Sequence, residues 1–437
     1  MTTVASVDLP PTGPCWTSFS RVGFRFLFVY VVLYALFTQL LTSLLPIPNL
    51  EIADLSTHWP MRPIVLWTAV HILRVPRPPF ADTGSGDKMF DWTLVFCMLV
   101  FAAIATVVWS LLDRKRPNYI TLYKWLRFGV RMVLVGQMFT YGLSKVIPTQ
   151  MPFPYLIRLL TPYGTFSPMG VLWTSIGSAP AYEIFAGSAE LLAGILILIP
   201  RTTTLGALVC MADMTNVFLL NMTYDVPVKL LSFHLFLLAF FLASPELSRL
   251  INFFFLNRTA PPSAEPPLFA TLRVNRIALA AQLLFGLSLF LVNAYTTYTY
   301  AKQFGFARPK SPLYGIWNVE QQFIDGQLRS PLLDDSGRWR RIVFDLPTRV
   351  TFQRIDDSFA RYGANINIRE KTVTITSDTD QNWKASFTIA RPTPDRLILD
   401  GDMDGHKTRL LLKLFDLKQF NLIGRGFHWV SVVPYNR

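Results

Sequence analysis

The stretch that decides the fold is Met89 to Leu112, MFDWTLVFCMLVFAAIATVVWSLL, which is followed directly by Asp113-Arg114-Lys115-Arg116. A helix that crosses a lipid bilayer needs about 20 predominantly apolar residues, and this run exceeds that length with a single charge near its start. The basic residues that follow are typical of the cytoplasmic end of a span. The run therefore predicts a transmembrane helix whose C-terminal end faces the cytoplasm.

The rest of the first 300 residues repeats this pattern. A hydrophobic fraction of 51% is typical of a membrane-embedded protein. The net charge of +13 comes mostly from Lys and Arg residues that lie between the apolar runs. That distribution argues against nucleic acid as a partner and predicts a cytoplasmic N-terminus. Seven spans are predicted: 22–45, 89–112, 122–147, 179–199, 203–222, 226–244 and 276–298.

Three segments between the spans have a different character. The loop 46–87 contains a short apolar stretch, 64–73, flanked by arginines, which favours a helix lying in the membrane interface. The segment 148–160 carries three prolines and is predicted to be re-entrant or interfacial, because proline interrupts a continuous helix. A Pro-rich linker over 259–275 precedes the last span.

After about residue 300 the chain changes to short runs with period-two alternation, separated by turn residues. This texture predicts a small antiparallel barrel or sandwich outside the membrane, on the side opposite the cytoplasm. The predicted strands are 315–320, 339–345, 349–355, 365–369, 372–377, 384–390, 396–400, 408–414 and 428–433.

Ionisable residues inside the predicted spans are the main functional clue, because such residues are costly in lipid and usually face a site or a polar network. Lys124, Arg131 and Lys145 share one face of the span 122–147, since their separations are near-whole turns. At about 1.5 Å per residue, Arg131, Glu190 and Asp213 lie roughly 13–18 Å deep. Arg131 is therefore predicted to pair with Glu190 or Asp213.

By the same depth argument, Lys145 and Glu183 lie near the outer surface and are predicted to pair. Further polar groups on the outer half of the neighbouring spans suggest a polar cavity open to the outside. They are Asn216, Asn221, Tyr224, Asp225, Lys229 and His234, and Tyr141 adds a polar group one turn before Lys145 on its own span. The ligand-binding candidates among them are Tyr141, Asn216, Asn221, Tyr224, Asp225 and Lys229.

Two alternatives remain at this stage. Buried ion pairs serve in some proteins only to fix helix register, and His234 is either a satisfied core histidine or a proton carrier. Haem b needs two facing intramembrane histidines, and no His, Cys or carboxylate cluster has metal-ligand spacing, so neither haem nor metal is expected.

The stretch 123–250 resembles the DoxX-like membrane family, which groups with the membrane domain of vitamin K-dependent carboxylases. The resemblance rests on Arg131, on Tyr141-Gly142-Leu143-Ser144-Lys145, on the Glu183 to Glu190 helix with its following basic turn, and on Asn221 to Lys229. It implies a four-helix unit linked to quinone-coupled redox chemistry. In the carboxylase branch it implies that Lys145 acts as a base.

The C-terminal part resembles a lipocalin-like barrel. Gly315-Ile316-Trp317 is similar to the family's Gly-x-Trp, and Arg425 to the late arginine that packs on that tryptophan. The resemblance implies a structural role for Gly315, Trp317 and Arg425 at the barrel base. Such a barrel either holds one small apolar ligand or is filled by its own side chains.

The predicted fold class is thus a membrane all-α helical bundle followed by an all-β antiparallel barrel. The predicted divisions are 1–120 with the first spans, 121–258 as the DoxX-like unit, 259–275 as the cytoplasmic linker, 276–299 as the last span and 300–437 as the extracytoplasmic barrel. The expected location is a bacterial inner membrane.

The leading functional hypothesis is an oxidoreductase or redox partner that binds a quinone or similar lipid-soluble cofactor. Its catalytic candidates are Lys145, Glu183, Glu190, Arg131, Asp213 and His234. One alternative is a non-enzymatic carrier of lipid or another apolar molecule, and another is a carboxylase-like enzyme. A further hypothesis is that the barrel docks a partner enzyme.

Overall fold

The computed structural model describes residues 15–45, 47, 54–78, 86–263, 267–332, 335, 337–380 and 382–435. Parts of the predicted loop 46–87 and of the linker 259–275 lie outside these residues. The chain divides into two compact units. The helical unit comprises Met1–Gln150 and Ile184–Tyr298, and the barrel unit comprises Met151–Glu183 and Thr299–Arg437.

This division corrects two predicted boundaries. Residues 151–183, predicted as part of the DoxX-like unit, cluster with the C-terminal strands, and the last span ends within the barrel unit. Hydropathy could not show this, because the segment 151–183 is held by specific contacts with strand residues that lie far along the chain.

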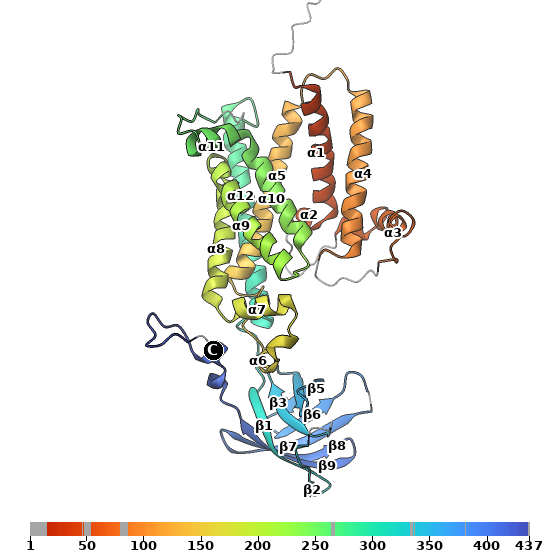
Figure 1. The fold of residues 1–437 in the computed structure, drawn as a ribbon, viewed down its shortest axis with the longest axis vertical. Helices are drawn as coiled ribbons and strands as arrows, with labels where there is room; N and C mark the ends of the chain where they lie inside the picture. The colour runs from red at the N-terminus through yellow and green to blue at the C-terminus, as the bar shows by residue number, and fades with distance from the viewer. Residues whose placement is uncertain are drawn as a thin grey trace, which may run out of the picture. The chain divides into compact units, whose positions relative to one another are not determined.

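The helical unit is built mainly from long apolar helices (Figure 1). Six of them are long and apolar enough to cross a membrane, so an integral membrane protein is indicated. The helices are α1 (Ser18–Phe37), α2 (Gln39–Thr42), α3 (Met61–His71), α4 (Met89–Leu112), α5 (Ile120–Val146), α8 (Pro180–Leu198), α9 (Thr203–Thr223), α10 (Lys229–Ala243), α11 (Leu247–Phe254) and α12 (Leu272–Gln303).

The predicted span 122–147 corresponds to α5, which is not among those six helices although it is 27 residues long. Its hydropathy is lowered by cations, among them Arg127 and Arg131, which are only 4% and 7% exposed. Most of the second half of α5 is also buried. The helix is therefore a central one that places polar groups inside its unit.

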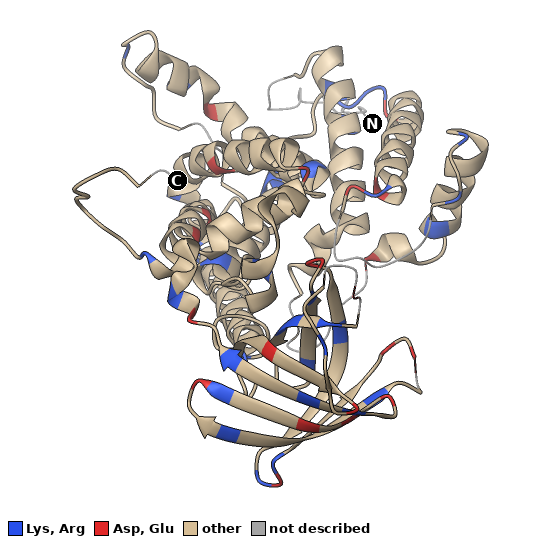
Figure 2. Ribbon diagram, turned by 60° about the horizontal axis from the view of Figure 1, so that its bottom comes forward, with Lys and Arg blue, Asp and Glu red and all other residues tan. Residues whose placement is uncertain are grey.

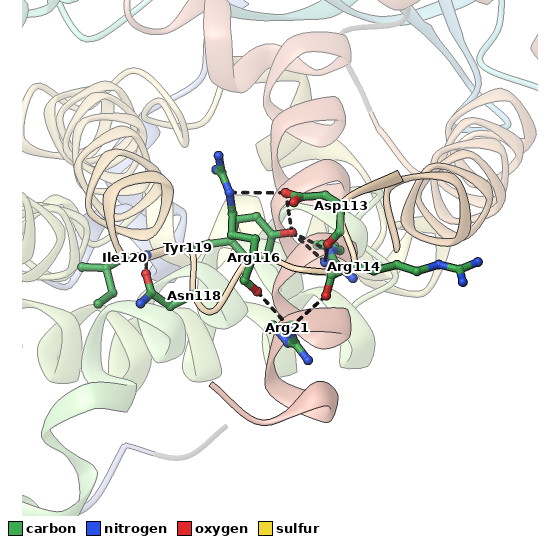
Figure 3. Close-up of polar contacts among 8 residues, drawn as sticks. Arg21, Asp113, Arg114, Arg116, Asn118, Tyr119 and Ile120 are labelled. Carbon is green, nitrogen blue, oxygen red and sulfur yellow. Dashed lines mark hydrogen bonds and ion pairs between the residues drawn. The ribbon is translucent and has the colours of Figure 1, made fainter. Parts of the chain in front are cut away.

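The basic turn between α4 and α5 is hydrogen-bonded to the start of α1, as Figure 3 shows for Arg21. Arg21 donates to the carbonyl oxygens of Arg114 and Arg116 at 3.4 and 2.9 Å. One turn later, buried Arg25 donates to the Tyr119 hydroxyl at 2.7 and 2.9 Å from two of its nitrogens. Arg25 therefore joins the start of α1 to the residue that precedes α5.

The barrel unit contains eight antiparallel strands closed by pairing of the first with the last (Figure 1). A two-residue strand, β2 (Gln327–Leu328), extends the first hairpin. The barrel strands are β1 (Gly315–Ile324), β3 (Trp339–Phe344), β4 (Arg349–Arg354), β5 (Phe359–Asn367), β6 (Thr372–Thr376), β7 (Lys384–Thr393), β8 (Arg396–Met403) and β9 (His406–Leu414).

Alternation along these strands separates a packed interior from a charged exterior, and Figure 2 shows Lys, Arg, Asp and Glu spread over the strands. The interior is filled by fully buried side chains such as Trp317, Phe344 and Phe352. Of the two possibilities for the barrel, filling by its own side chains is therefore the better supported.

The predicted contact between Arg425 and Trp317 is wrong. Arg391 lies over the Trp317 ring at 5.6 Å, whereas Arg425 is exposed and lies over Tyr435 at 4.3 Å. The predicted strand 428–433 is likewise absent, and that segment is exposed. Trp317 does have the structural role predicted for it, because it is fully buried and its indole nitrogen donates to the Leu313 carbonyl at 2.9 Å.

The segment 151–183 carries α6 (Leu156–Leu160) and α7 (Pro168–Gly177) rather than one helix. Asp345 at the end of β3 accepts from the Leu156 backbone amide at 2.7 Å. Arg308 lies 3.6 Å from Asp345 and stacks over the Tyr155 ring. Burial raises the pKa of Asp345 above its ordinary value, so this contact costs desolvation and is a specific structural connection.

Candidate functional site

The ion pair at the centre of the site is Lys145 of α5 with Glu190 of α8. The Lys145 Nζ lies 2.5 Å from the Glu190 Oε1, and the two side chains are 8% and 2% exposed. Such a pair in an apolar bundle is costly unless it is closely matched, and intramembrane ionisable groups usually mark a site.

Two glycines bring the helices together beside this pair. A Cβ added at Gly187 would lie 2.6 Å from the Gly142 carbonyl oxygen and 2.6 Å from the Lys145 Cβ, so the backbones cross in close contact. Each glycine precedes a charged residue by three positions, as Gly142 precedes Lys145 and Gly187 precedes Glu190. The crossing and the pair therefore lie on the same helix faces.

The predicted partner of Lys145, Glu183, is wrong for a geometric reason. Helices α5 and α8 run antiparallel, since Gly142 meets Gly187 while Phe139 meets Gly194. Side chains lean toward the N-terminus of their own helix, so on antiparallel helices Lys145 and Glu190 lean toward each other from different depths. Matching residues by depth alone ignores this lean. Glu183 instead accepts from the Met151 backbone amide at 3.0 Å.

Polar groups of three helices extend the site. The Lys145 ammonium lies 5.7 Å from the centre of the Tyr141 ring. The Tyr141 hydroxyl accepts from the Gln39 side chain at 2.7 Å, and Gln39 also donates to Gln137 at 3.2 Å. Asp213 of α9 interacts electrostatically with Glu190 and Lys145.

Two carboxylate oxygens of this cluster are notable. Within the described part of the chain, the Glu190 Oε2 and the Asp213 Oδ2 are buried and have no hydrogen-bond partner. Buried acceptors of this kind are rare in folded proteins and require a proton, a water molecule or a polar ligand group. The cluster can therefore accept a proton, or a hydrogen bond from water or from a polar ligand group.

Arg131, predicted to join Glu190 or Asp213, belongs to a different place. It lies 14 residues before Lys145 on α5, which is about 21 Å along the helix axis. There it lines a cavity of about 830 Å³. This basic cavity is also lined by Lys124, Arg127, Arg201, Glu246 and Arg249, together with apolar side chains of α9, α11 and α12.

A second cavity, the apolar chamber, has a volume of about 780 Å³. Its lining comes from α1, α2, α5, α10 and α12, and Gln282 is the polar side chain among the residues that line it. The basic cavity and the apolar chamber share Phe128, Leu268, Ala278 and Gln282. The polar chamber predicted as a single outward-facing space is thus replaced by the Lys145 cluster near one end of α5 and these two cavities toward the other.

His234 is a satisfied core histidine, which was one of its two alternatives. Its Nδ1 donates to the Leu230 carbonyl at 2.7 Å, and its Nε2 lies 2.6 Å from the Tyr30 hydroxyl. Its ring stacks on Tyr34 with centroids 3.8 Å apart. One ring nitrogen is therefore bonded within α10, and the other joins α10 to α1.

The remaining candidates lie at or near the turn between α9 and α10. Asn221 donates to the Val228 carbonyl at 3.3 Å and to Ser232 at 3.1 Å, which closes the turn. Lys229 forms an ion pair with Asp225, whose side chain is 83% exposed. Tyr224 caps the end of α9, and Asn216 is exposed on its surface. These residues have structural or surface roles and do not join the Lys145 cluster through any interaction described above.

Sequence reasoning missed several residues that matter here. Gln39 and Gln137 carry no charge, so a search for ionisable residues inside the predicted spans does not find them. Arg127 was not distinguished from the other charged residues of its span. The paired Gly-x-x-Lys and Gly-x-x-Glu spacings were a usable signal for the helix crossing. Among the described residues, no group of three or more His, Cys, Asp or Glu side chains is placed to hold a metal ion.

Fold and site together define a class: an integral membrane helical unit with a buried ion pair and two adjoining cavities, followed by a closed β-barrel. No family model matches the chain. It is 34% identical over 111 residues to the uncharacterized protein YwoB of Bacillus subtilis (strain 168), an alignment that covers 23% of this chain and 64% of that relative. No solved structure matches.

Proposed function

We propose that this protein binds a lipid-soluble molecule inside its helical unit. The observation that carries the proposal is the apolar chamber, whose volume of about 780 Å³ is that of a site for a small ligand or a lipid chain. A chamber with such a lining favours a long apolar group over a polar solute, because burying polar groups without partners is costly.

Ligand binding in the chamber can be tested by substituting a glycine on its wall. Gly129 of α5 lines the chamber, and a Cβ added there meets nothing within 4 Å. Gly129→Phe should therefore fill the chamber without straining the helix. We expect native mass spectrometry of the purified protein to show a bound lipid-soluble molecule in the wild type and occupancy lowered about tenfold or more in this variant.

The matched control is Gly23→Phe on α1. A Cβ at Gly23 also meets nothing within 4 Å, and Gly23 does not line the chamber. This variant should retain the ligand. Equal occupancy in both variants, or a wild type that carries no such molecule, contradicts the proposal.

A second candidate function is proton-coupled chemistry on a quinone-like molecule. It is favoured by the Glu190 and Asp213 oxygens that have no hydrogen-bond partner in the described residues and lie near a lysine. Groups of this kind exchange protons with a polar head group or with water. A lysine held in an ion pair is a poor base, so the carboxylase-type role has less support.

Quinone binding is measurable directly. We expect lipid extracts of the purified protein to contain a quinone, and a short-chain ubiquinone added at 100 times its dissociation constant to stabilise the protein by about 2.7 kcal/mol. The paired substitution Lys145→Met with Glu190→Met should reduce that stabilisation, because it removes the polar partners. Extracts without quinone, together with an unchanged unfolding temperature, would count against this function and leave the carrier function standing.

A further inference from the structure

The segment 425–435, which follows the barrel strands, carries large apolar side chains that the barrel does not cover. Phe427, Trp429, Val430 and Val432 are 78%, 91%, 85% and 103% exposed. Single exposed apolar residues are common on protein surfaces, whereas a contiguous group of them marks an interaction site. The segment therefore points to a partner outside the barrel.

This segment has a defined local structure. Arg425 donates to the Ser431 hydroxyl at 3.0 Å and lies over the Tyr435 ring at 4.3 Å, so the chain folds back on itself. The rings of Phe427 and Trp429 meet edge to face with their centroids 5.3 Å apart. These contacts group the two rings into one cluster and leave both of them exposed.

The segment begins at the end of the barrel where the chain arrives from α12. Strand β9 ends beside the start of β1, where the Phe415 amide donates to the Ile316 carbonyl at 2.8 Å. Helix α12 ends at Gln303, and Arg308 in the connection from α12 to β1 lies 3.6 Å from Asp345 at the end of β3. Because α12 is one of the six candidate spans, this end of the barrel is the one joined to the membrane.

Exposed aromatic residues mark the end of α12 as well. Tyr295, Tyr298, Tyr300 and Phe304 are each about half exposed, and the rings of Tyr300 and Phe304 lie 4.8 Å apart. Aromatic side chains with a polar edge gather where a span meets the lipid head groups. This pattern indicates that the head-group region begins where α12 leads into the barrel.

We propose that residues 427–433 insert into the head-group region of the membrane that α12 crosses. Trp429, Val430, Val432 and Val433 are all exposed by 72% or more, so the barrel covers no side of this stretch. A flat protein surface would cover one side of it, whereas lipid surrounds it. Its backbone is neither helix nor strand, so the stretch lies at the level of the head groups, where water satisfies the peptide groups.

A second copy of the chain is a less suitable partner. The barrel is closed by pairing of β1 with both β3 and β9, so its eight strands leave no free edge to which a strand from another copy adds. Charge also favours lipid, because residues 417–435 include Lys418 and Arg425 but no Asp or Glu. Such a segment is attracted to anionic head groups.

The test uses a fluorescent label on the full-length protein in nanodiscs that hold one copy each. Cys15→Ser removes the exposed cysteine, and Cys97 and Cys210 are buried. Val430→Cys then carries the label, and lipids with a nitroxide on the head group quench it wherever the two meet. The matched control is Thr379→Cys, which is exposed in the connection from β6 to β7 at the opposite end of the antiparallel barrel.

We expect strong quenching of the label at position 430 and little at position 379. Phe427→Ser with Trp429→Ser should lower the ratio of inserted to free segment about a hundredfold, at about tenfold for each ring, and so abolish the quenching at position 430. Both rings are exposed, so this variant retains the barrel core.

Equal quenching at the two labelled positions would overturn the proposal, as would a double variant in which the quenching at position 430 persists. A label at position 430 that is shielded only in nanodiscs holding two copies would show a contact between copies of this chain, and would overturn it too.

Discussion

Lys145→Met lowers the free energy of unfolding by about 3–5 kcal/mol, because it leaves the Glu190 carboxylate buried without its cation. Adding Glu190→Met restores most of that loss, since two thioether side chains fill a similar volume and carry no charge. The measurement is unfolding of the purified protein in mixed micelles with increasing denaturing detergent, followed by tryptophan fluorescence.

The control for this prediction is the exposed ion pair of Lys229 with Asp225. Lys229→Met should change the free energy of unfolding by less than about 1 kcal/mol, because exposed pairs contribute little. If Lys145→Met is equally mild, the Lys145 side chain is not buried against Glu190 and the site described above does not exist.

Gly187→Ala destabilises the helical unit by about 3 kcal/mol or more. The added methyl group would meet backbone atoms of Gly142 and Val146 at 2.6 and 2.8 Å, and backbone cannot yield as a flexible side chain does. Helices α5 and α8 must then separate, which also lengthens the Lys145 to Glu190 contact. The same unfolding experiment measures the loss.

Two other glycines give a graded comparison for Gly187→Ala. At Gly142 the nearest atom to an added Cβ is in the Leu191 side chain at 2.8 Å, so Gly142→Ala should cost less. At Gly129 nothing lies within 4 Å, and Gly129→Ala should be neutral or stabilising because alanine favours the helix. A different order of the three variants would contradict the close crossing of α5 and α8.

The fold class followed from the sequence because its two signals are local. Apolar runs of bilayer length mark the spans, and period-two alternation with turn residues marks the strands. Eight predicted strands overlap observed ones, from Gly315 in β1 to Leu414 in β9, although the predicted strand 365–369 shares only residues 365–367 with β5 (Phe359–Asn367). Closure of the barrel and the placement of 151–183 were beyond these signals, since both depend on contacts between distant segments such as Leu156 with Asp345.

The site was predictable in its residue types and only partly in its pairings. Lys145, Glu190 and Asp213 do come together, but Arg131 lies about 21 Å away along α5, and Glu183 binds a backbone amide. Depth along a span is readable from sequence, whereas the direction in which a side chain leans depends on the relative orientation of two helices. The two cavities had no sequence signal of their own, because their walls are assembled from seven helices: α1, α2, α5, α9, α10, α11 and α12.

The most direct test of the account is a cryo-electron microscopy map of the full-length protein in lipid nanodiscs. Elongated density in the apolar chamber beside Gly129 is the expected result. A chamber closed by its own side chains, with lipid density confined to the outer surface of the helices, would contradict it.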